Sequence, residues 1–210
     1  SLSDDIIREE GVERVRDVLA RHGLRAGTSG MPVNFRDDEE TFERDIRELP
    51  TAAKMLSEVG CTRILTWLRP YHETLPYEEH FEQLRRRTAR ICPILEEYGI
   101  RYGLEFVGPE TMRRGQPHPF IHDLDGILSL IEAVDAPNLG MLLDAFHWYT
   151  SAGTRQDLER LSDDLIVGVH VNDALPDRSR EEQIDNERAL PGEPGVVDIA
   201  TFLQALHAIG

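Results

Sequence analysis

The stretch LGMLLDAFH, residues 139–147, combines a buried strand with polar residues at its end. Its apolar run predicts a strand from Leu139 to Phe146 that is covered on both faces, as parallel strands usually are. Asp144 and His147 stand at the end of this strand. In parallel βα architectures the functional side chains lie where strands end and loops begin. The stretch therefore predicts an α/β fold whose site lies at the carboxyl end of the sheet.

Strands and helices alternate along the chain on both sides of this stretch. Further strands are predicted at 62–68, 100–107 and 165–171, and a short apolar stretch occupies 24–35. Amphipathic periodicity predicts helices at 4–21, 38–58, 77–98, 120–135, 154–162 and 197–208, with a polar loop over 174–193. Such alternation is typical of βαβ units and parallel sheets. Because no Gly- or Ser-rich linker divides the chain, we expect one domain over residues 1–210.

The composition excludes several classes of partner. The 210 residues carry 39 acidic and 23 basic side chains, which gives a net charge of −16. Such a chain lacks the basic surface that nucleic acid requires, and anionic lipid would repel it. We expect Cys61 and Cys92 to be buried free thiols of a reducing compartment, because two cysteines are too few for a disulfide framework. No run reaches membrane-spanning length, so the expected location is the cytoplasm.

Three successive predicted strands each carry a metal-ligand type of residue near their ends: Glu105, Asp144 and His170. Taken singly, such an Asp is more often a helix cap and such a His a core residue. Together they favour a metal site, because a buried carboxylate needs a partner charge or a cation. Oxygen-rich ligation with one imidazole suits one divalent ion, namely Mn²⁺, Co²⁺, Mg²⁺ or Zn²⁺.

Aromatic residues near the strand ends are candidates for the wall of a ligand pocket. Trp67, Phe106, Phe146 and Trp148 all lie there, although core packing explains them equally well. Trp148 is the strongest pocket candidate of the four because it adjoins His147. His147 itself is expected to turn into the pocket beside the metal, or else to lie in a surface loop.

Several segments resemble the xylose isomerase-like TIM barrel family of sugar phosphate isomerases and epimerases. They are GLEF at 103–106, LDAFH at 143–147 and VHVND at 169–173, in that order. The loop sequence over 185–198 is similar to the inosose isomerase branch of that family. The resemblance covers nearly the whole chain from Leu24 onward, and its ordered set of motifs is specific where a single motif is not.

The resemblance implies a (β/α)₈ barrel and a role for each matching residue. Glu105, Asp144 and His170 are the implied metal ligands, and Glu105 is also one of two carboxylates that move a proton between adjacent carbons. The implied role of His147 is a hydrogen bond to the substrate carbonyl or hydroxyl. Further candidates for substrate contact are Glu110 and Arg188. Trp148 is a candidate as well, because it adjoins His147.

The barrel of this family has more strands than this sequence predicts. The five predicted strands correspond to strands three to seven of the barrel, so the first two and the last are expected to be absent from this chain. The family's fourth ligand, a second Glu, stands at the end of that last strand. The domain is therefore expected to be incomplete at both ends.

The expected activity is isomerisation or epimerisation of a ketose, a keto-inositol or a related sugar. Proton transfer between neighbouring carbons passes through an ene-diolate, whose charge a divalent cation stabilises. Because no Gly-rich phosphate loop is evident, a free sugar is favoured over a phosphosugar. The expected partner is this small molecule, with neither nucleic acid nor membrane, and the sequence is compatible with a homo-oligomer.

Two alternatives remain open at this stage. The endonuclease IV type of metal-dependent DNA-repair nuclease shares the fold and the strand motifs, and it uses three zinc ions and a basic surface. The net charge of −16 and the single lysine, Lys54, oppose it, and His72 is the one candidate for an additional ligand. The second alternative is a catalytically inactive barrel that acts as a binding module.

Overall fold

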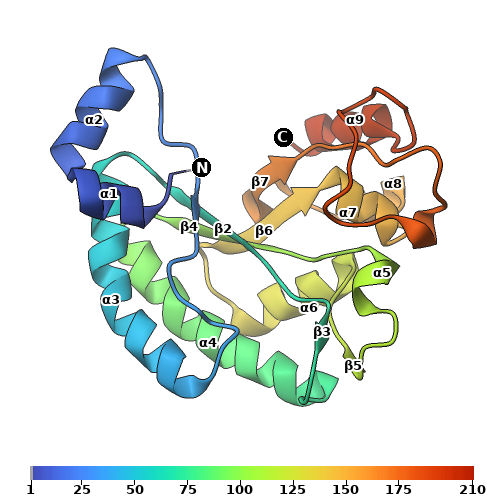
Figure 1. Cartoon of the computed structure of the whole chain (residues 1–210), viewed down its shortest axis with the longest axis horizontal. Helices are drawn as coiled ribbons and strands as arrows, with labels where there is room; N and C mark the ends of the chain where they lie inside the picture. The colour runs from blue at the N-terminus through green and yellow to red at the C-terminus, as the bar shows by residue number, and fades with distance from the viewer. Residues whose placement is uncertain (1) are drawn as a thin grey trace.

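The structure, a computed structural model, describes residues 2–210 and is built on a parallel sheet (Figure 1). The sheet follows chain order, with each strand beside the one before it. Its strands are β1 (Ser29–Gly30), β2 (Arg63–Trp67), β4 (Arg101–Glu105), β6 (Leu139–Asp144) and β7 (Ile166–His170). This order is what successive right-handed βαβ units produce, so the predicted α/β class is confirmed.

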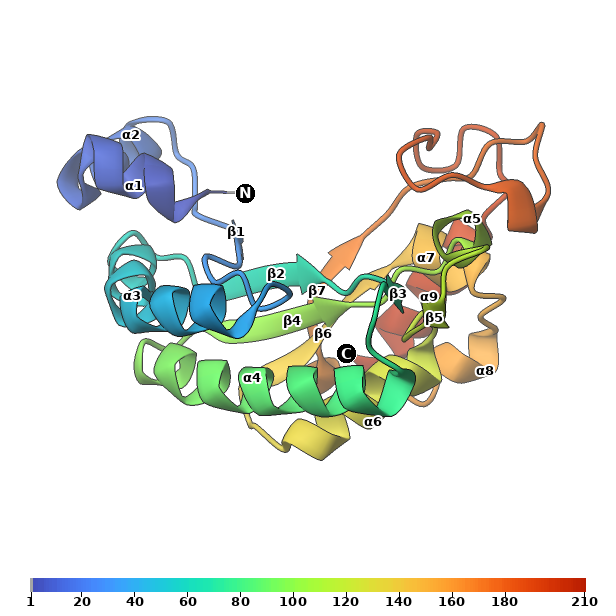
Figure 2. The same ribbon diagram turned by 60° about the horizontal axis from the view of Figure 1, so that its bottom comes forward.

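The helices cover one face of the curled sheet. Figure 2 shows α3 (Glu39–Glu58), α4 (Tyr77–Glu97) and α6 (Leu124–Val134) packed side by side along its outer face. Asp38 and Asp123 begin α3 and α6 by accepting hydrogen bonds from the backbone, as N-cap residues do. The remaining helices are α1 (Asp4–Glu10), α2 (Val12–Arg21), α5 (Glu110–Arg113), α7 (Ala145–Thr150), α8 (Arg155–Leu158) and α9 (Ile199–Ile209).

The structure differs from the predicted elements in several places, including an additional short helix α5 and a shorter helix α8 where 154–162 was predicted. The helix predicted over 4–21 is two helices, because Gly11 between them has a φ of 83° that glycine adopts readily. The predicted strand over Leu139 to Phe146 ends at Asp144, where α7 begins. A short antiparallel ribbon of β3 (Tyr71–His72) and β5 (His118–Pro119) was not predicted.

A buried arginine fixes the segment that follows β1. Arg87 on α4 is 1% exposed and donates to the backbone oxygens of Phe35 and Asp37 at 2.9 and 2.6 Å. Its guanidinium also pairs with Glu39 at 2.8 Å. These contacts hold residues 35–39 against α4, which places the carboxyl end of β1 beside that of β2.

The cysteine prediction is confirmed, since Cys61 and Cys92 are both buried and free. Burial raises the pKa of Cys92 to about 12, so this thiol is an inert part of the core. Within residues 2–210 no helix has the length and hydropathy that crossing a membrane requires.

Candidate metal centre

The predicted ligands come from three adjacent strands and lie at the carboxyl end of the sheet. Glu105 is the last residue of β4, Asp144 of β6 and His170 of β7. In the strand register Asp144 is paired with His170, and Glu105 is paired with Trp67 at the end of β2. Parallel pairing thus places the three side chains together, although they lie 65 residues apart along the chain (170 − 105).

The distances between these side chains suit a common cation. His170 Nδ1 lies 3.8 Å from Glu105 Oε1 and 3.8 Å from Asp144 Oδ2. His147 Nε2 lies 4.0 Å from the same Glu105 oxygen. Ligand atoms of Glu105, Asp144 and His147 all lie within 4.8 Å of one another. Two ligands that are each ~2.0–2.4 Å from one ion are at most ~4.8 Å apart, so both histidines are within range.

The electrostatics of Glu105 call for a positive partner. Its side chain is buried, and Oε1 has no hydrogen-bond partner among the described residues. Burial, reinforced by the charge of Asp144, raises the pKa of Glu105 to about 8. A carboxylate in such a place needs either a proton or a cation. Glu105, Asp144 and His170 therefore fit a divalent ion in donor type, distance and charge.

Arg188 of the loop between β7 and α9 reaches into this cluster. Its Nη1 donates to Asp144 Oδ2 at 2.9 Å, and its Nη2 donates to Asp185 Oδ1 at 2.7 Å. The guanidinium lies over the ring of Phe146, 4.4 Å from its centroid. Arg188 thus brings a guanidinium group into contact with Asp144, at a position from which it also faces His147.

His147 occupies the first turn of α7, with its ring almost fully buried. Burial lowers the pKa of His147 to about 4, which keeps the imidazole neutral. The backbone N–H of Gly108 donates to Nδ1 at 3.3 Å, and Arg188 Nη2 lies 3.2 Å from Nε2. Because Nδ1 accepts from Gly108 and the carboxylate of Asp185 lies 3.5 Å from Nε2, we assign the proton of the neutral ring to Nε2. A Cβ at Gly108 would collide with the backbone of α7, so glycine is required for this contact.

A cavity of about 290 Å³ opens beside the cluster. Its volume is close to the lower end of ligand pockets, which is ~300 Å³. Its walls mix charged and apolar side chains: Trp67, Glu105, Val107, Met112, His147, Asp185, Asn186 and Arg188. The cavity therefore joins one candidate ligand, Glu105, to His147, Arg188 and the aromatic side chain of Trp67.

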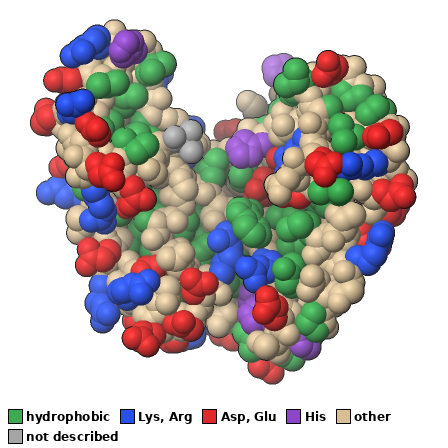
Figure 3. Space-filling view, in the orientation of Figure 1, with side chains coloured by type: hydrophobic (Ala, Val, Ile, Leu, Met, Phe, Trp, Pro, Cys, Tyr) green, Lys and Arg blue, Asp and Glu red, His purple; other side chains and the backbone are tan. Residues whose placement is uncertain are grey.

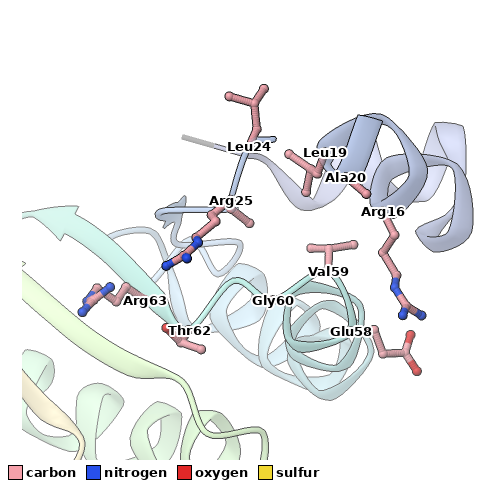
Figure 4. A pocket seen from close by; sticks show the side chains of 11 residues that line it. Arg16, Leu19, Ala20, Leu24, Arg25, Glu58, Val59, Gly60, Thr62 and Arg63 are labelled. Atoms are coloured by element: carbon pink, nitrogen blue, oxygen red, sulfur yellow. The ribbon is translucent and has the colours of Figure 1, made fainter. Parts of the chain in front are cut away.

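A larger hollow lies at the other end of the strands and carries none of these groups. It measures about 580 Å³ and lies between α2 and the start of β2, where Figure 4 shows Arg25 and Arg63 near its floor. In TIM barrels the amino ends of the strands serve stability, whereas the chemistry occurs at the carboxyl ends. The smaller cavity is thus the candidate active site.

Three residues considered from the sequence lie outside the cavity wall. Trp148 is buried against Phe202 of α9 and donates to Thr154 O at 3.1 Å, so its position differs from the pocket role predicted for it. Glu110 pairs with Arg114 one turn further along. His72 lies on β3, where its Nδ1 accepts from backbone N–H groups and not from the cluster.

Two residues of the cavity wall were not favoured from the sequence, namely Asp185 and Trp67. Asp185 lies in a polar loop among many acidic residues, so no pattern distinguishes it. Its carboxylate holds Arg188 and lies 3.5 Å from His147 Nε2. Trp67 lies next to the end of the strand predicted over 62–68, and in the structure it is the last residue of β2.

A buried carboxylate anchors the base of the loop that carries Arg188. Asp173 is fully buried and follows β7 by three residues. Its Oδ1 accepts from the backbone N–H groups of Ala174, Val196 and Val197, and its Oδ2 from that of Gly195. One side chain thus ties the two ends of the loop together.

We expect Asp173→Asn to lower the free energy of unfolding by about 2–3 kcal/mol, because hydrogen bonds to a charged acceptor are lost and the new amide N–H₂ opposes backbone donors. Urea unfolding measures this difference. Asp177→Asn, in the exposed part of the same loop, is the matched control and should change the value by less than about 0.5 kcal/mol. Equal effects of the two substitutions would contradict the anchoring role.

The sequence of the chain matches a known family over almost its whole length. Residues 4–210 match the xylose isomerase-like TIM barrel family. The chain belongs to this family. Both the predicted resemblance and the predicted TIM-barrel fold are thereby confirmed.

Curated relatives of this xylose isomerase-like chain are named inosose isomerases. That of Bacillus velezensis is 26% identical over 207 residues, which are 98% of this chain and 71% of the relative. That of Bacillus subtilis is 28% identical over 122 residues, which are 58% of this chain and 41% of the relative. The matched part is therefore a portion of each relative.

Solved structures agree with this assignment. A xylose isomerase domain protein from Alicyclobacillus acidocaldarius superposes with a TM-score of 0.91 at 31% identity, covering 100% of this chain and 75% of the other. An IOLI protein with a bound zinc atom superposes with a TM-score of 0.81 at 21% identity, covering 98% and 71%. The second likeness bears on the fold alone, and the zinc belongs to that protein.

Proposed function

We propose that this chain carries the active site of a divalent-metal-dependent isomerase or epimerase of ketoses, keto-inositols or related sugars. The observation that carries the proposal is the convergence of Glu105, Asp144 and His170 around a buried, unpaired carboxylate oxygen. The names of the relatives, inosose isomerases, support the reaction class. The zinc atom in the related IOLI structure supports the metal.

Glu105, Asp144 and His170 are the residues that would hold the ion. When bound, a divalent cation supplies a Lewis acid that stabilises the negative charge of an ene-diolate. Asp144 is suited to this task because only its Oδ1 serves as the N-cap of α7, which leaves Oδ2 directed at the cluster. No thiol lies among the proposed ligands, consistent with a hard cation.

Glu105 is the proposed base. Its unpaired Oε1 is the oxygen that would hold the ion, and its second oxygen, Oε2, is the one that would accept a proton from a substrate C–H in the cavity that Glu105 lines. A bound sugar in the neighbouring cavity would contact this oxygen, His147 and Arg188 together. The arrangement suits removal of a proton from the carbon next to a carbonyl.

His147 and Arg188 are the proposed substrate-orienting residues. With its proton on Nε2, His147 donates a hydrogen bond to a carbonyl or hydroxyl oxygen in the cavity. Arg188 adds a second donor directly beside His147, held in direction by Asp185. Donors fixed in this way stabilise developing charge without reorganising during the reaction.

Replacing His147 by Asn tests the orienting role. Turnover should fall by about 10²–10³-fold, the usual loss when one donor to a developing oxyanion is removed. The metal content of the purified protein should stay the same, because His147 is assigned to the substrate. Elemental analysis and initial rates measure the two quantities, and loss of the metal in this variant would instead assign His147 as a ligand.

Solvent deuterium exchange tests the reaction class itself. The protein is loaded with Mn²⁺ or Co²⁺ and incubated in D₂O with a panel of ketoses and inososes. For at least one sugar, proton NMR should show deuterium at the carbon beside the carbonyl, together with an isomer or epimer. A panel with neither exchange nor conversion, on protein that binds the metal, would favour the inactive binding module.

A further inference from the structure

A second group of cationic side chains lies beside the candidate active site, at the carboxyl ends of β1 and β2. It surrounds a small cavity of about 30 Å³ whose walls include Arg36, Arg69, Tyr71, His72 and His80. Within residues 2–210 no Asp or Glu side chain lines this cavity, although the chain has a net charge of −16. In the middle of the face shown in Figure 3, Lys or Arg side chains gather beside a histidine.

Arg36 is held rigidly but its charge is left uncompensated. Its Nε donates to Trp67 O at 3.1 Å and its Nη2 donates to Thr66 Oγ1 at 2.8 Å. The guanidinium stacks on the Trp67 ring at 4.4 Å and on Phe35 at 4.6 Å. Among the described residues no carboxylate pairs with Arg36, and its Nη1 has no hydrogen-bond acceptor there. A fixed guanidinium edge thus faces the cavity without a counter-ion.

Arg69 brings a second positive charge close to the first. Burial lowers the pKa of Arg36, and the like charge of Arg69 lowers it further. The carboxylate near Arg69 is that of Glu73, 3.8 Å away on a side chain that is 73% exposed. Such an exposed pair contributes little, so two guanidinium groups are held together with no strong internal partner.

His80 is a second and independent indication that this cavity binds a polar ligand. Its ring lines the same cavity and is 5% exposed, yet Nδ1 has no hydrogen-bond partner among the described residues. Leaving a buried polar atom unpaired costs about 1–3 kcal/mol. Burial lowers the pKa of His80 to about 4, and the neighbouring His72, Arg69 and Arg87 lower it further.

We propose that this cavity is an oxyanion subsite that binds the phosphate or carboxylate group of the sugar substrate. Guanidinium groups match such oxyanions in charge and in hydrogen-bond geometry. A volume of 30 Å³ holds roughly two water molecules, so it would take two oxygens of the group while the remainder faces solvent.

The assignment of this subsite to the sugar substrate rests on the proposed function. Trp67 connects the subsite to the candidate active site. The indole lines the metal-site cavity, while the backbone oxygen of the same residue holds Arg36. In the sheet, Trp67 is paired with Glu105. A sugar lying across Trp67 would thus place its reacting carbons at Glu105 and an anionic end at Arg36.

An anionic sugar differs from the uncharged sugar that we expected from the sequence. That expectation rested on the lack of a Gly-rich phosphate loop. In this subsite the side chains of Arg36, Arg69 and His80 come from three separate segments, the loops after β1 and β2 and the helix α4. No local sequence motif therefore predicts the subsite.

Binding of inorganic phosphate tests the subsite directly. Calorimetry on the metal-loaded protein in a non-coordinating buffer compares the parent chain with Arg69→Gln and Arg36→Lys. We expect the parent to bind one phosphate per chain and each variant to bind it about 10- to 100-fold more weakly, as loss of a charge-assisted hydrogen bond implies. Arg85→Gln is the matched control, since Arg85 is similarly exposed on α4 and should leave phosphate binding unchanged. No phosphate binding by the parent, or equal binding by Arg69→Gln, would overturn the proposal.

Kinetics then decide whether the anion belongs to the substrate. D-fructose 6-phosphate, D-fructuronate and D-fructose are compared in the deuterium-exchange assay. We expect the parent to prefer the anionic sugars at least 10-fold in kcat/KM, and Arg69→Gln to lose this preference. Phosphate should compete with the anionic sugars.

The remaining outcomes separate the two proposals. Phosphate that binds through Arg69 but neither competes nor alters the choice of sugar would make free phosphate the ligand and overturn the substrate assignment. Phosphate binding through Arg69 without exchange into any sugar would support the subsite as an oxyanion site and count against the proposed function.

Discussion

Glu105→Gln is expected to reduce turnover by more than the ~10²–10⁴-fold that loss of a single general base causes. The substitution keeps the shape of the side chain but removes both its charge and its capacity to accept a proton. Since Glu105 is also a proposed ligand, metal affinity should fall in the same variant. Initial rates and elemental analysis, measured on the same preparation, give the two effects.

Glu132→Gln is the control for this experiment. Glu132 is an exposed carboxylate on α6, remote from the strand ends, and its replacement should change neither quantity. A Glu105→Gln protein that converts sugars at the parent rate would end the isomerase proposal and leave the binding module as the better account.

Asp144→Asn is expected to weaken metal binding by more than ~100-fold, because loss of an outer-shell partner alone typically costs 10–100-fold. Asn can still accept from the backbone N–H of Phe146, so α7 should keep its cap. What is lost is the charge that faces His170 and Arg188. Calorimetric titration with Mn²⁺ measures the affinity, and circular dichroism checks that the helices persist.

The matched control here is Asp123→Asn, at the N-cap of α6. Asp123 caps a helix just as Asp144 does but lies outside the candidate site. The two substitutions should therefore differ in metal binding, and Asp144→Asn alone also removes the ion pair with Arg188. If both leave the Mn²⁺ affinity unchanged, Asp144 is a cap and not a ligand.

Much of the fold was predictable because burial on a parallel sheet leaves a continuous apolar signal. Strands such as β4 and β6 are buried at almost every position, and their sequences show it. Hydrophobic periodicity did not predict the helix and strand ends that backbone geometry determines. The apolar pattern continues through Gly11, although the helix breaks there, and α7 is as apolar as the strand before it.

The candidate site was predictable in its ligands and less so in its surroundings. Glu105, Asp144 and His170 lie near the ends of predicted strands, so parallel pairing alone places them together. Residues that reach the site from loops carry no such positional signal, as Asp185 shows. Trp148 was misjudged because a helical turn after Asp144 directs it toward α9, whereas a continued strand would not.

The most direct test of the account is the number of tight Mn²⁺ sites, counted by electron paramagnetic resonance titration of the purified chain. We expect one high-affinity site per chain, lost when Asp144→Asn and His170→Asn are combined and retained when the exposed pair Asp125→Asn and His207→Asn is combined. A parent chain without a tight site, or a tight site that survives the loss of Asp144 and His170, would contradict the central claim that these strand ends form a metal centre.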